Sequence, residues 1–332
     1  MSNFISLGLL ATIVVSTPQS GWLQDFDSAL KVAAESERDV LVEFSGSDWC
    51  PWCKKMEAAI FGRPKFAEKA GKEYVLVKVD LPRSPQIKAQ VPDFDRNQIL
   101  VLEYRIETYP TILLMTADGT PYARMGFVEG GPKVFREHVE QLRQQFRPDH
   151  VEALRIIQSF AEGDEEQRAE LAELALALYP KLPTTSQLLG KLAPILSQFQ
   201  ALDPDNASGS LARALKLLLP SGFATRQQMQ CAEDIDPDNA LGLQELSVLA
   251  DCLTVYNKEG RLRVAQKVLK LHKLGTIRDE RAAKALYANG CIWIAQELAE
   301  LGTAKELGRL ALPYLKGEVD LGARVRKVLD TQ

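Results

Sequence analysis

Two cysteines, Cys50 and Cys53, are separated only by a proline and a tryptophan. Two thiols at this spacing can form a small disulfide and exchange it with a disulfide of another protein. Residues 39–44 before the pair form an apolar run typical of a buried strand, and residues 54–60 after it have helical spacing of apolar positions. Cys50 is therefore expected near a helix N-terminus, where backbone N–H groups favour a thiolate, as the accessible sulfur, with Cys53 sheltered.

Two other interpretations of this spacing remain. A Cys-x-x-Cys pair can be half of a zinc site, but zinc requires four ligands and therefore a second pair. The remaining cysteines and the histidines show no such spacing, so no metal is expected. A merely structural disulfide is the other alternative, although the strand-to-helix setting favours a redox-active pair. The residues considered as further ligands are Cys231, Cys252, Cys291, His138, His150 and His272.

A second stretch, at residues 104–114, reads Tyr-Arg-Ile-Glu-Thr-Tyr-Pro-Thr-Ile-Leu-Leu. Together with the cysteine pair it resembles the thioredoxin superfamily, in which a cis-proline beside the two cysteines precedes a strand. The resemblance implies that Pro110 is cis and lines the substrate groove, and that backbone groups of Tyr109 pair with an incoming peptide. The cis form of an X–Pro bond costs only about 0.5–1 kcal/mol, so the sequence permits it. An ordinary trans proline at the start of a strand is the alternative.

Glu43 takes the place of the acid that lies buried behind the active site in this superfamily. A desolvated carboxyl group there is expected to take the proton of Cys53 as that thiol attacks. The alternative is that Glu43 points to solvent, which the pattern of the strand does not exclude. The lysine that accompanies this acid in thioredoxin is predicted to be missing, because Leu76 stands in its place and Lys78 is two residues further on.

The immediate surroundings of the cysteines differ from those of thioredoxin. The run Asp48-Trp49-Cys50 more closely resembles bacterial extracytoplasmic thioredoxin-like domains of the thiol:disulfide interchange type. The dipeptide between the cysteines, Pro51-Trp52, helps to set the reduction potential, and thioredoxin-like folds cover about 150 mV, so the direction of electron flow stays open. Trp49 and Trp52 are expected to form an apolar rim for peptide docking, with ordinary packing as the alternative.

Composition limits the possible partners. The chain has 332 residues, 46% hydrophobic and 25% charged, which fits a soluble protein of two domains. A net charge of -4 gives no reason to expect nucleic acid or an anionic membrane as partner. No nicotinamide or flavin fingerprint is present, so no cofactor is expected and electrons must come from another thiol protein. Cys231, Cys252 and Cys291 are expected to be buried free thiols, with a Cys231–Cys252 bridge as the alternative in an oxidising compartment.

The N-terminus gives an expectation about compartment. Residues 4–15 form an uncharged apolar run of signal-peptide length, too short to span a bilayer comfortably. Ser16 or Ser20 would end a cleaved segment. Residues 1–20 are therefore predicted to be a signal peptide, and the protein is expected in the periplasm or elsewhere outside the cytoplasm. Because no lysine or arginine precedes the run, an uncleaved membrane anchor and a cytosolic edge strand are the alternatives.

Residues 21–147 are predicted to form an α/β thioredoxin fold, a central mixed sheet flanked by helices. Residues 81–92 are expected to be an irregular insertion, and the loops at 82–94 and 126–132 are expected to rim the groove and select substrates. The predicted helices cover residues 26–36, 54–60, 97–104 and 132–145, and the predicted strands cover 40–44, 74–80, 111–115 and 122–125.

Residues 150–332 are predicted to form an all-α domain that begins after a boundary at Arg147-Pro148-Asp149. The phrase Leu-Asp-Pro-Asp-Asn-Ala at 202–207 returns as Ile-Asp-Pro-Asp-Asn-Ala at 235–240, 33 residues later. It resembles the junction between tetratricopeptide units, whose period is about 34 residues. The prediction is a degenerate helical-repeat array whose concave surface binds a protein partner. The alternative is a helical domain that only packs against the redox domain.

Together these features predict an enzyme, a thiol–disulfide oxidoreductase. Its expected partners are proteins with disulfides or dithiols, together with a thiol protein that donates electrons. Reduction of extracytoplasmic proteins is the preferred direction, and a disulfide oxidase or isomerase on the same fold is the alternative. A non-catalytic helical-repeat adaptor with a redox-sensing thioredoxin-like domain is the rival class of protein.

Overall fold

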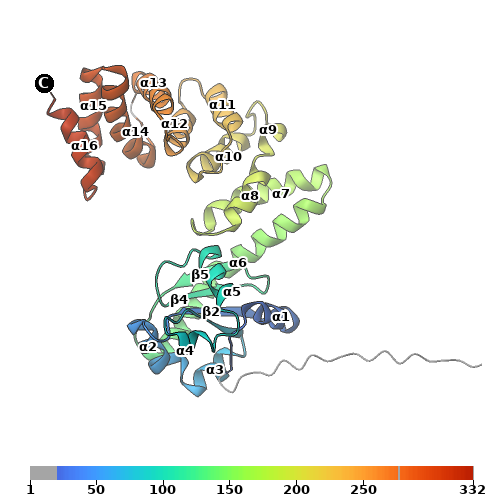
Figure 1. Ribbon diagram of the computed structural model, residues 1–332. Helices are drawn as coiled ribbons and strands as arrows, with labels where there is room; N and C mark the ends of the chain where they lie inside the picture. The colour runs from blue at the N-terminus through green and yellow to red at the C-terminus, as the bar shows by residue number, and fades with distance from the viewer. Residues whose placement is uncertain (1–20, 276, 332) are drawn as a thin grey trace, which may run out of the picture. The chain divides into compact units, whose positions relative to one another are not determined.

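The computed structural model describes residues 21–275 and 277–331 (Figure 1). The chain divides into two compact units, and the boundary between them along the sequence lies between His150 and Val151. The predicted signal peptide at 1–20 lies outside the described residues. Within the described ranges, no helix combines the length and the apolar character that crossing a membrane requires.

A five-stranded mixed sheet forms the centre of the first unit, in the order β1-β3-β2-β4-β5. β3 runs parallel to β1 and β2, whereas β4 runs antiparallel to β2 and β5. All seven residues of β2 are buried, since this strand is central and both faces of the sheet are covered. The strands are β1 (Trp22–Leu23), β2 (Asp39–Ser45), β3 (Tyr74–Asp80), β4 (Thr111–Met115) and β5 (Pro121–Met125).

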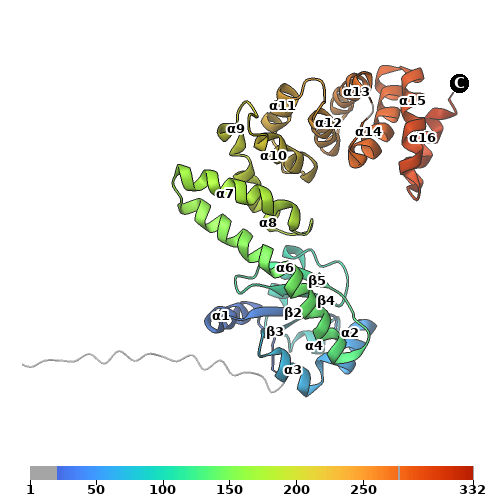
Figure 2. The ribbon, with the colours of Figure 1, turned by 180° about the vertical axis from the view of Figure 1, so that it is seen from behind.

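Helices cover both faces of this sheet (Figures 1 and 2). They are α1 (Phe26–Ser36), α2 (Pro51–Met56), the π-helical segment η1 (Glu57–Phe61), α3 (Pro64–Ala70), α4 (Pro85–Lys88), α5 (Phe94–Glu103) and α6 (Gly131–Glu162). Side chains of a strand point alternately to opposite faces. Val42 belongs to the core formed with α1 and α5, whereas Leu41 belongs to the core formed with α2, η1 and α6. Glu43 has the parity of Leu41 and therefore lies on the face covered by α2.

The predicted α/β fold is confirmed, and the strands at 74–80 and 111–115 have the predicted bounds. The expected end of the last helix is wrong, because α6 continues to Glu162 and passes through Pro148. A proline inside a helix removes one backbone hydrogen bond. Side chains on either side of it hold the helix to the sheet: Arg147 donates two hydrogen bonds to Asp39, and His150 lies 3.2 Å from the hydroxyl of Thr116. The residues predicted as a boundary therefore lie within one helix.

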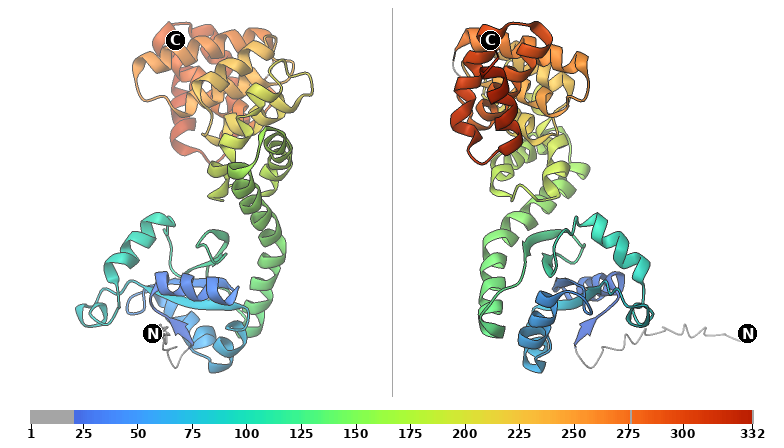
Figure 3. Two further views of the ribbon diagram at one scale, coloured as in Figure 1. Left: turned by 90° about the vertical axis from the view of Figure 1, so that its right-hand side faces the viewer. Right: turned by 60° about the vertical axis from the view of Figure 1, so that its left-hand side comes forward.

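The described part of the second unit is helical throughout, so the predicted fold class is confirmed there as well (Figure 3). Its helices are α7 (Glu165–Leu178), α8 (Leu188–Leu196), α9 (Phe199–Leu202), α10 (Ser210–Leu218), α11 (Arg226–Ile235), α12 (Leu243–Leu253), α13 (Lys258–Leu274), α14 (Glu280–Trp293), α15 (Leu301–Ala311) and α16 (Val319–Leu329), with short 3-10 or π-helical segments at Tyr179–Lys181, Leu219–Ser221, Ile294–Leu298 and Leu312–Leu315. Helices α11 to α16 form consecutive contacting pairs, and the second helix of each pair contacts the second helix of the next. Stacked helix pairs of this kind are typical of repeat proteins. Their assignment to the tetratricopeptide type stays a prediction.

The repeated sequence phrase adopts the same local structure twice. Asp203 accepts hydrogen bonds from the backbone at the start of α10, and Asn206, at a left-handed φ of 54°, accepts one from Ala212. These bonds satisfy N–H groups that a helix start leaves unpaired. In the second copy Asp236, Asn239 (φ 58°) and the start of α12 repeat the arrangement. The prolines of both copies lie in the turns between helices.

The three remaining cysteines are free thiols, so no Cys231–Cys252 bridge is present. Cys291 is buried as expected, while Cys231 and Cys252 are only half-buried. Burial raises the pKa of both Cys252 and Cys291 to about 11. At neutral pH these two side chains are therefore poor nucleophiles.

Candidate active site

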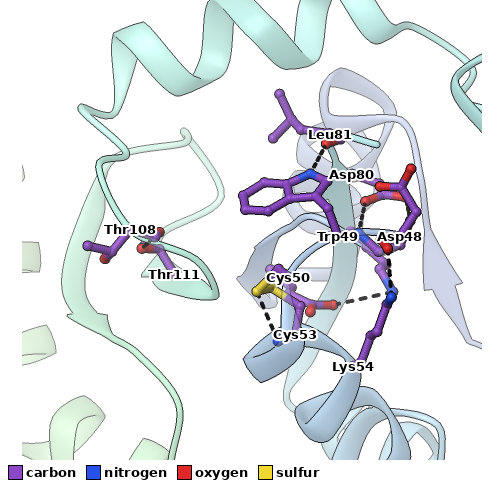
Figure 4. Close-up of a disulfide and its surroundings, with 12 residues drawn as sticks. Asp48, Trp49, Cys50, Cys53, Lys54, Asp80, Leu81, Thr108 and Thr111 are labelled. Atoms are coloured by element: carbon purple, nitrogen blue, oxygen red, sulfur yellow. Dashed lines mark hydrogen bonds and ion pairs between the residues drawn. A yellow bond between two sulfur atoms is a disulfide. The ribbon is translucent and has the colours of Figure 1, made fainter. Parts of the chain in front are cut away.

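Cys50 and Cys53 form a disulfide with their Cα atoms 5.3 Å apart (Figure 4). Cys50 is the N-cap of α2, and its sulfur accepts a hydrogen bond from the backbone N–H of Cys53 at 3.1 Å. Pro51 occupies the first helical position, where its missing N–H leaves no bond unmade. The predicted position of Cys50 at a helix N-terminus is confirmed. The helix dipole and this N–H favour negative charge on the Cys50 sulfur once the disulfide is reduced.

Residue exposure does not distinguish Cys50 from Cys53 in the oxidised protein. Cys50 is 2% exposed and Cys53 is 1% exposed, so the predicted accessibility of Cys50 is wrong for this state. The preceding loop turns back on itself, and the N–H of Cys50 donates to the carbonyl of Gly46 at 2.8 Å. What separates the two cysteines is their place at the helix start, with Cys50 outside the first turn and Cys53 within it.

The active-site loop is fixed to the chain that follows β3. Ser47 donates a backbone hydrogen bond to Asp80 at 2.9 Å. The carboxylate of Asp48 accepts backbone hydrogen bonds from Arg83 and Ser84. Burial opposes ionisation of Asp48, but these hydrogen bonds keep its pKa below the ordinary value. The start of the predicted insertion at 81–92 is therefore part of the active-site scaffold, and it contains the short helix α4.

Trp49 forms a fixed wall of the site. Its indole N–H donates to the carbonyl of Leu81 at 2.8 Å, and the guanidinium of Arg83 lies 4.2 Å from its ring centroid. The ring packs so closely on Gly46 that a Cβ there would approach it to 2.3 Å. On the other side, the ring of Tyr109 meets Trp49 edge-on at 5.3 Å. Both predicted interpretations of Trp49 fit its half-buried position, since it packs tightly and still borders the disulfide.

The Tyr109–Pro110 bond is cis, as the superfamily resemblance predicts, and the trans alternative is wrong. Pro110 comes directly before β4, which pairs with β2 so that Thr111 lies opposite Phe44. The hydroxyl of Thr111 donates to the carbonyl of Thr108 at 2.7 Å and closes the loop. Figure 4 shows this loop across from the disulfide, on the side away from Leu81. The fold thus brings the cis-proline loop and the two cysteines to one site.

Trp52 is the most exposed aromatic side chain near the disulfide, at 54% exposure. Its ring lies 5.2 Å from that of Phe127, and the ammonium of Lys55 lies within about 5 Å of both rings. Lys55 also pairs with Glu129 at 3.3 Å. The sequence argument placed the loop at 126–132 beside the groove but did not identify Phe127. An aromatic residue in a short glycine-containing loop was the available signal.

Glu43 is completely buried, so its predicted burial is confirmed and the alternative that it faces solvent is wrong. Burial raises the pKa of Glu43 to about 7, although the positive charge of Lys78 acts against this shift. Neither carboxylate oxygen has a hydrogen-bond partner of normal geometry among residues 21–275 and 277–331. A carboxyl group with this pKa can both accept and release a proton near neutral pH.

The expectation that this acid lacks a lysine is wrong. The parallel register places Lys78 opposite Glu43, and the two side chains approach to 3.8 Å. The same ammonium donates a hydrogen bond to Glu57 at 2.9 Å. Although burial acts against it, Glu43 and Glu57 raise the pKa of Lys78. Counting the register from Asp39, opposite Tyr74, would have found Lys78; no feature of the sequence singled out Glu57.

Comparisons with known proteins find a matching family model and several relatives. Residues 26–143 match the family model of the thioredoxin-like domain. The Disulfide bond reductase DsbH of Chlamydia pneumoniae is 32% identical over 119 residues, which are 35% of this chain and 69% of that protein. The Thioredoxin-related protein DsbJ of Chlamydia pneumoniae is 29% identical over 106 residues, which are 32% of this chain and only 30% of that protein. A solved structure of a DsbH oxidoreductase aligns at 28% identity and a TM-score of 0.32, covering 42% of this chain and 95% of that one.

Proposed function

Because this chain belongs to the thioredoxin-like family and is a thiol–disulfide oxidoreductase, we propose that it reduces disulfide bonds in extracytoplasmic partner proteins. The observation that carries the proposal is the Cys50–Cys53 pair at the start of α2, across from the cis-Pro110 loop. Similarity to a disulfide bond reductase supports the reductive direction. The apolar run at 4–15 supports a location outside the cytoplasm, with residues 1–20 as a signal peptide or an uncleaved anchor.

The first chemical step is attack on the partner. The thiolate of reduced Cys50 attacks one sulfur of the partner's disulfide, so that a bond between Cys50 and the partner forms while the partner's own S–S bond breaks. The released partner thiolate takes up a proton. Trp49 and the loop at Tyr109 and Pro110 border the path of the incoming chain, where backbone groups of Tyr109 would pair with it and the exposed ring of Trp52 would contact it.

The second step releases the reduced partner. Cys53 passes its proton to the carboxylate of Glu43, and the resulting thiolate attacks the sulfur of Cys50. The bond between Cys50 and the partner breaks, and the Cys50–Cys53 disulfide described above is restored. Two electrons have passed to the partner, so another thiol protein must reduce the pair before the next cycle. The same steps run backwards would oxidise a dithiol.

Reduction of insulin disulfides in the presence of a dithiol donor tests the enzymatic proposal. We expect Cys50→Ser to lose the catalysed rate, while Cys252→Ser, which changes a free thiol in the second unit, keeps it. Equal rates for the wild type and Cys50→Ser would contradict catalysis and favour the redox-sensing adaptor. Cys53→Ser is expected to hold partners as mixed disulfides, because the second step cannot occur. Partners captured in this way from intact cells would identify substrate and compartment together.

The reduction potential of the Cys50–Cys53 pair tests the proposed direction of electron flow, from this protein to its partner. Thioredoxin, a reductant, has a potential of about -270 mV, whereas the oxidant DsbA lies near -120 mV. A value for the Cys50–Cys53 pair near the lower end, measured against glutathione, is the expected result. A value near the upper end would favour the oxidase or isomerase alternative.

For the second unit we propose that the region at 150–332 is a helical-repeat array that binds a protein partner. The proposal is supported by the stacked pairs of α11 to α16 and by the two matching Asp-Pro-Asp-Asn turns. Comparison of the proteins captured by full-length Cys53→Ser with and without surface substitutions on α12 and α14 tests it. An unchanged set of partners would favour a purely structural role.

A further inference from the structure

We propose that Glu57 is a positioning residue that controls the protonation of Glu43 by holding the ammonium group of Lys78. The arrangement of charges stands on its own geometry. Its consequence for catalysis rests on the proposed function, in which Glu43 receives the proton of Cys53.

Lys78 is shared unequally between the two carboxylates. Its nitrogen lies 2.9 Å from an oxygen of Glu57, which is a hydrogen-bonding distance, and 3.8 Å from an oxygen of Glu43, which is not. The ammonium therefore neutralises Glu57 directly and acts on Glu43 only through space. A small movement of Lys78 toward Glu43 would exchange one hydrogen bond for the other.

The three side chains lead from the surface to the interior. The side chain of Glu57 is 47% exposed, that of Lys78 is 21% exposed and that of Glu43 is 1% exposed. Glu57 is the first residue of η1, the π-helical continuation of the helix that Cys50 begins. π-Helical turns are rare and occur frequently at functional sites. A Cβ at Gly62, just after η1, would approach the backbone carbonyl of Glu57 to 2.8 Å and its carboxylate to 3.3 Å.

The charged groups facing Glu43 come from two elements besides its own strand. β3 contributes Lys78 and Asp80, and η1 contributes Glu57. On the other neighbouring strand, Glu43 lies opposite the uncharged Ile112. Burial and the two acids favour the protonated form of Glu43, and Lys78 is the cation among the described residues that opposes them. Neither oxygen has a hydrogen-bond partner of normal geometry in the described ranges, and the hydroxyl of Ser45 on the same strand lowers the pKa of Glu43 less than Lys78 does, so the position of Lys78 strongly influences the charge of Glu43.

Titration of the Glu43 carboxyl in the oxidised protein, followed by carbon-13 NMR and assigned with Glu43→Gln, tests the proposal without any catalytic assay. Glu57→Gln removes the competing anion and allows Lys78 to pair with Glu43. We expect the pKa of Glu43 to fall by about 1 unit. Lys78→Met removes the cation, and we expect the pKa to rise by about 1 unit or more.

Glu129→Gln is the matched control, because it also removes an exposed carboxylate that pairs with a lysine, Lys55. It is expected to leave the titration of Glu43 unchanged. The double variant tests whether Glu57 acts through Lys78. In the Lys78→Met background, Glu57→Gln should cause much less of the shift in the pKa of Glu43 than it causes in the wild type. If Glu57→Gln shifts the pKa of Glu43 equally with and without Lys78, Glu57 acts on Glu43 by direct repulsion. If Glu57→Gln alone leaves that pKa unchanged, the two carboxyl groups are not coupled. Either result would overturn the proposal.

The catalytic consequence has a separate measurement. The rate at which Cys53 resolves a preformed mixed disulfide, recorded against pH, should show its acid limb moving to lower pH in Glu57→Gln, in step with the carboxyl titration. Glu57→Asp, with a shorter carboxylate, should restore part of the wild-type profile. A shifted titration with an unchanged rate profile would support the control of Glu43 by Glu57 while refuting the role of Glu43 in the proposed function.

Discussion

Cys291 of the helical unit is as deeply buried as the cysteine pair of the redox unit and yet differs from it in chemistry. Cys50 and Cys53 are 2% and 1% exposed, and Cys291 in the helical unit is 0% exposed. Cys50 stands at a helix N-terminus and accepts a backbone hydrogen bond, whereas Cys291 lies within α14, where burial raises its pKa to about 11. Burial alone therefore does not decide whether a thiol reacts. Its position relative to free backbone N–H groups does.

The largest expected contrast between the units is in the rate of insulin reduction after Cys50 or Cys291 is replaced. Cys50→Ala should lower the rate of insulin reduction by more than about 100-fold, because the attacking sulfur is lost. Cys291→Ala should leave that rate unchanged, although it creates a small cavity in the core. Parallel assays of the two purified variants, with circular dichroism as the check on folding, measure the contrast. Loss of activity in Cys291→Ala with an intact fold would show that the helical unit takes part in the chemistry.

Alkylation of the reduced protein sharpens the same comparison. We expect the reaction of Cys50 with iodoacetamide to reach half its maximum below the value of about 8.5 for a free thiol. Cys252 and Cys291 should react at an appreciable rate only as the pH approaches the pKa of about 11 that burial gives them. Peptide mass mapping after short exposures across a pH series assigns each rate. An ordinary value for Cys50 would contradict its activation by the helix.

The buried acid of the redox unit predicts a pH dependence of stability. The pKa of Glu43 is about 7 in the folded protein and near 4.3 when unfolded, so the folded state binds the additional proton between these values. The contribution of Glu43 to the free energy of unfolding is therefore fully present below about pH 4.3. It falls by about 3 kcal/mol as the pH rises to 7.

Urea unfolding at pH 5 and pH 8 measures this loss. Glu43→Gln should remove most of the difference between the two pH values, since glutamine does not titrate. The control is Glu129→Gln, whose exposed carboxylate should leave the pH dependence as in the wild type. A wild-type protein that is equally stable at both values, after correction by that control, would mean that Glu43 is ionised in the fold.

Local sequence predicted those parts of the site that depend on neighbours along the chain. The cysteine spacing and the helix formers after it predicted Cys50 near a helix N-terminus, where it is the N-cap. The cis bond of Pro110 was implied by the resemblance of the surrounding residues to the thioredoxin superfamily. The strands at 74–80 and 111–115, which are rich in β-branched and other apolar residues, have the predicted bounds.

Features that depend on pairing across the fold were missed. Lys78 reaches Glu43 only through the register of two parallel strands, and Glu57 reaches Lys78 from a separate helix. The continuation of α6 through Pro148 depends on tertiary bonds from Arg147 and His150 to the sheet, which outweigh the local preference of proline. The low exposure of Cys50 in the oxidised protein was likewise not predicted from the sequence.

Two closely packed glycines, one in each unit, provide the finest test of the comparison. In Gly46→Ala the new methyl group would meet the ring of Trp49 at 2.3 Å, and in Gly308→Ala it would meet the sulfur of Cys291 at 2.9 Å. Each should lower the free energy of unfolding by about 1–3 kcal/mol, because close-packed cores resist added volume. Only Gly46→Ala should also slow insulin reduction, since it displaces the wall beside the disulfide. Equal activity in the two variants at matched stability would show that the position of Trp49 does not matter for exchange.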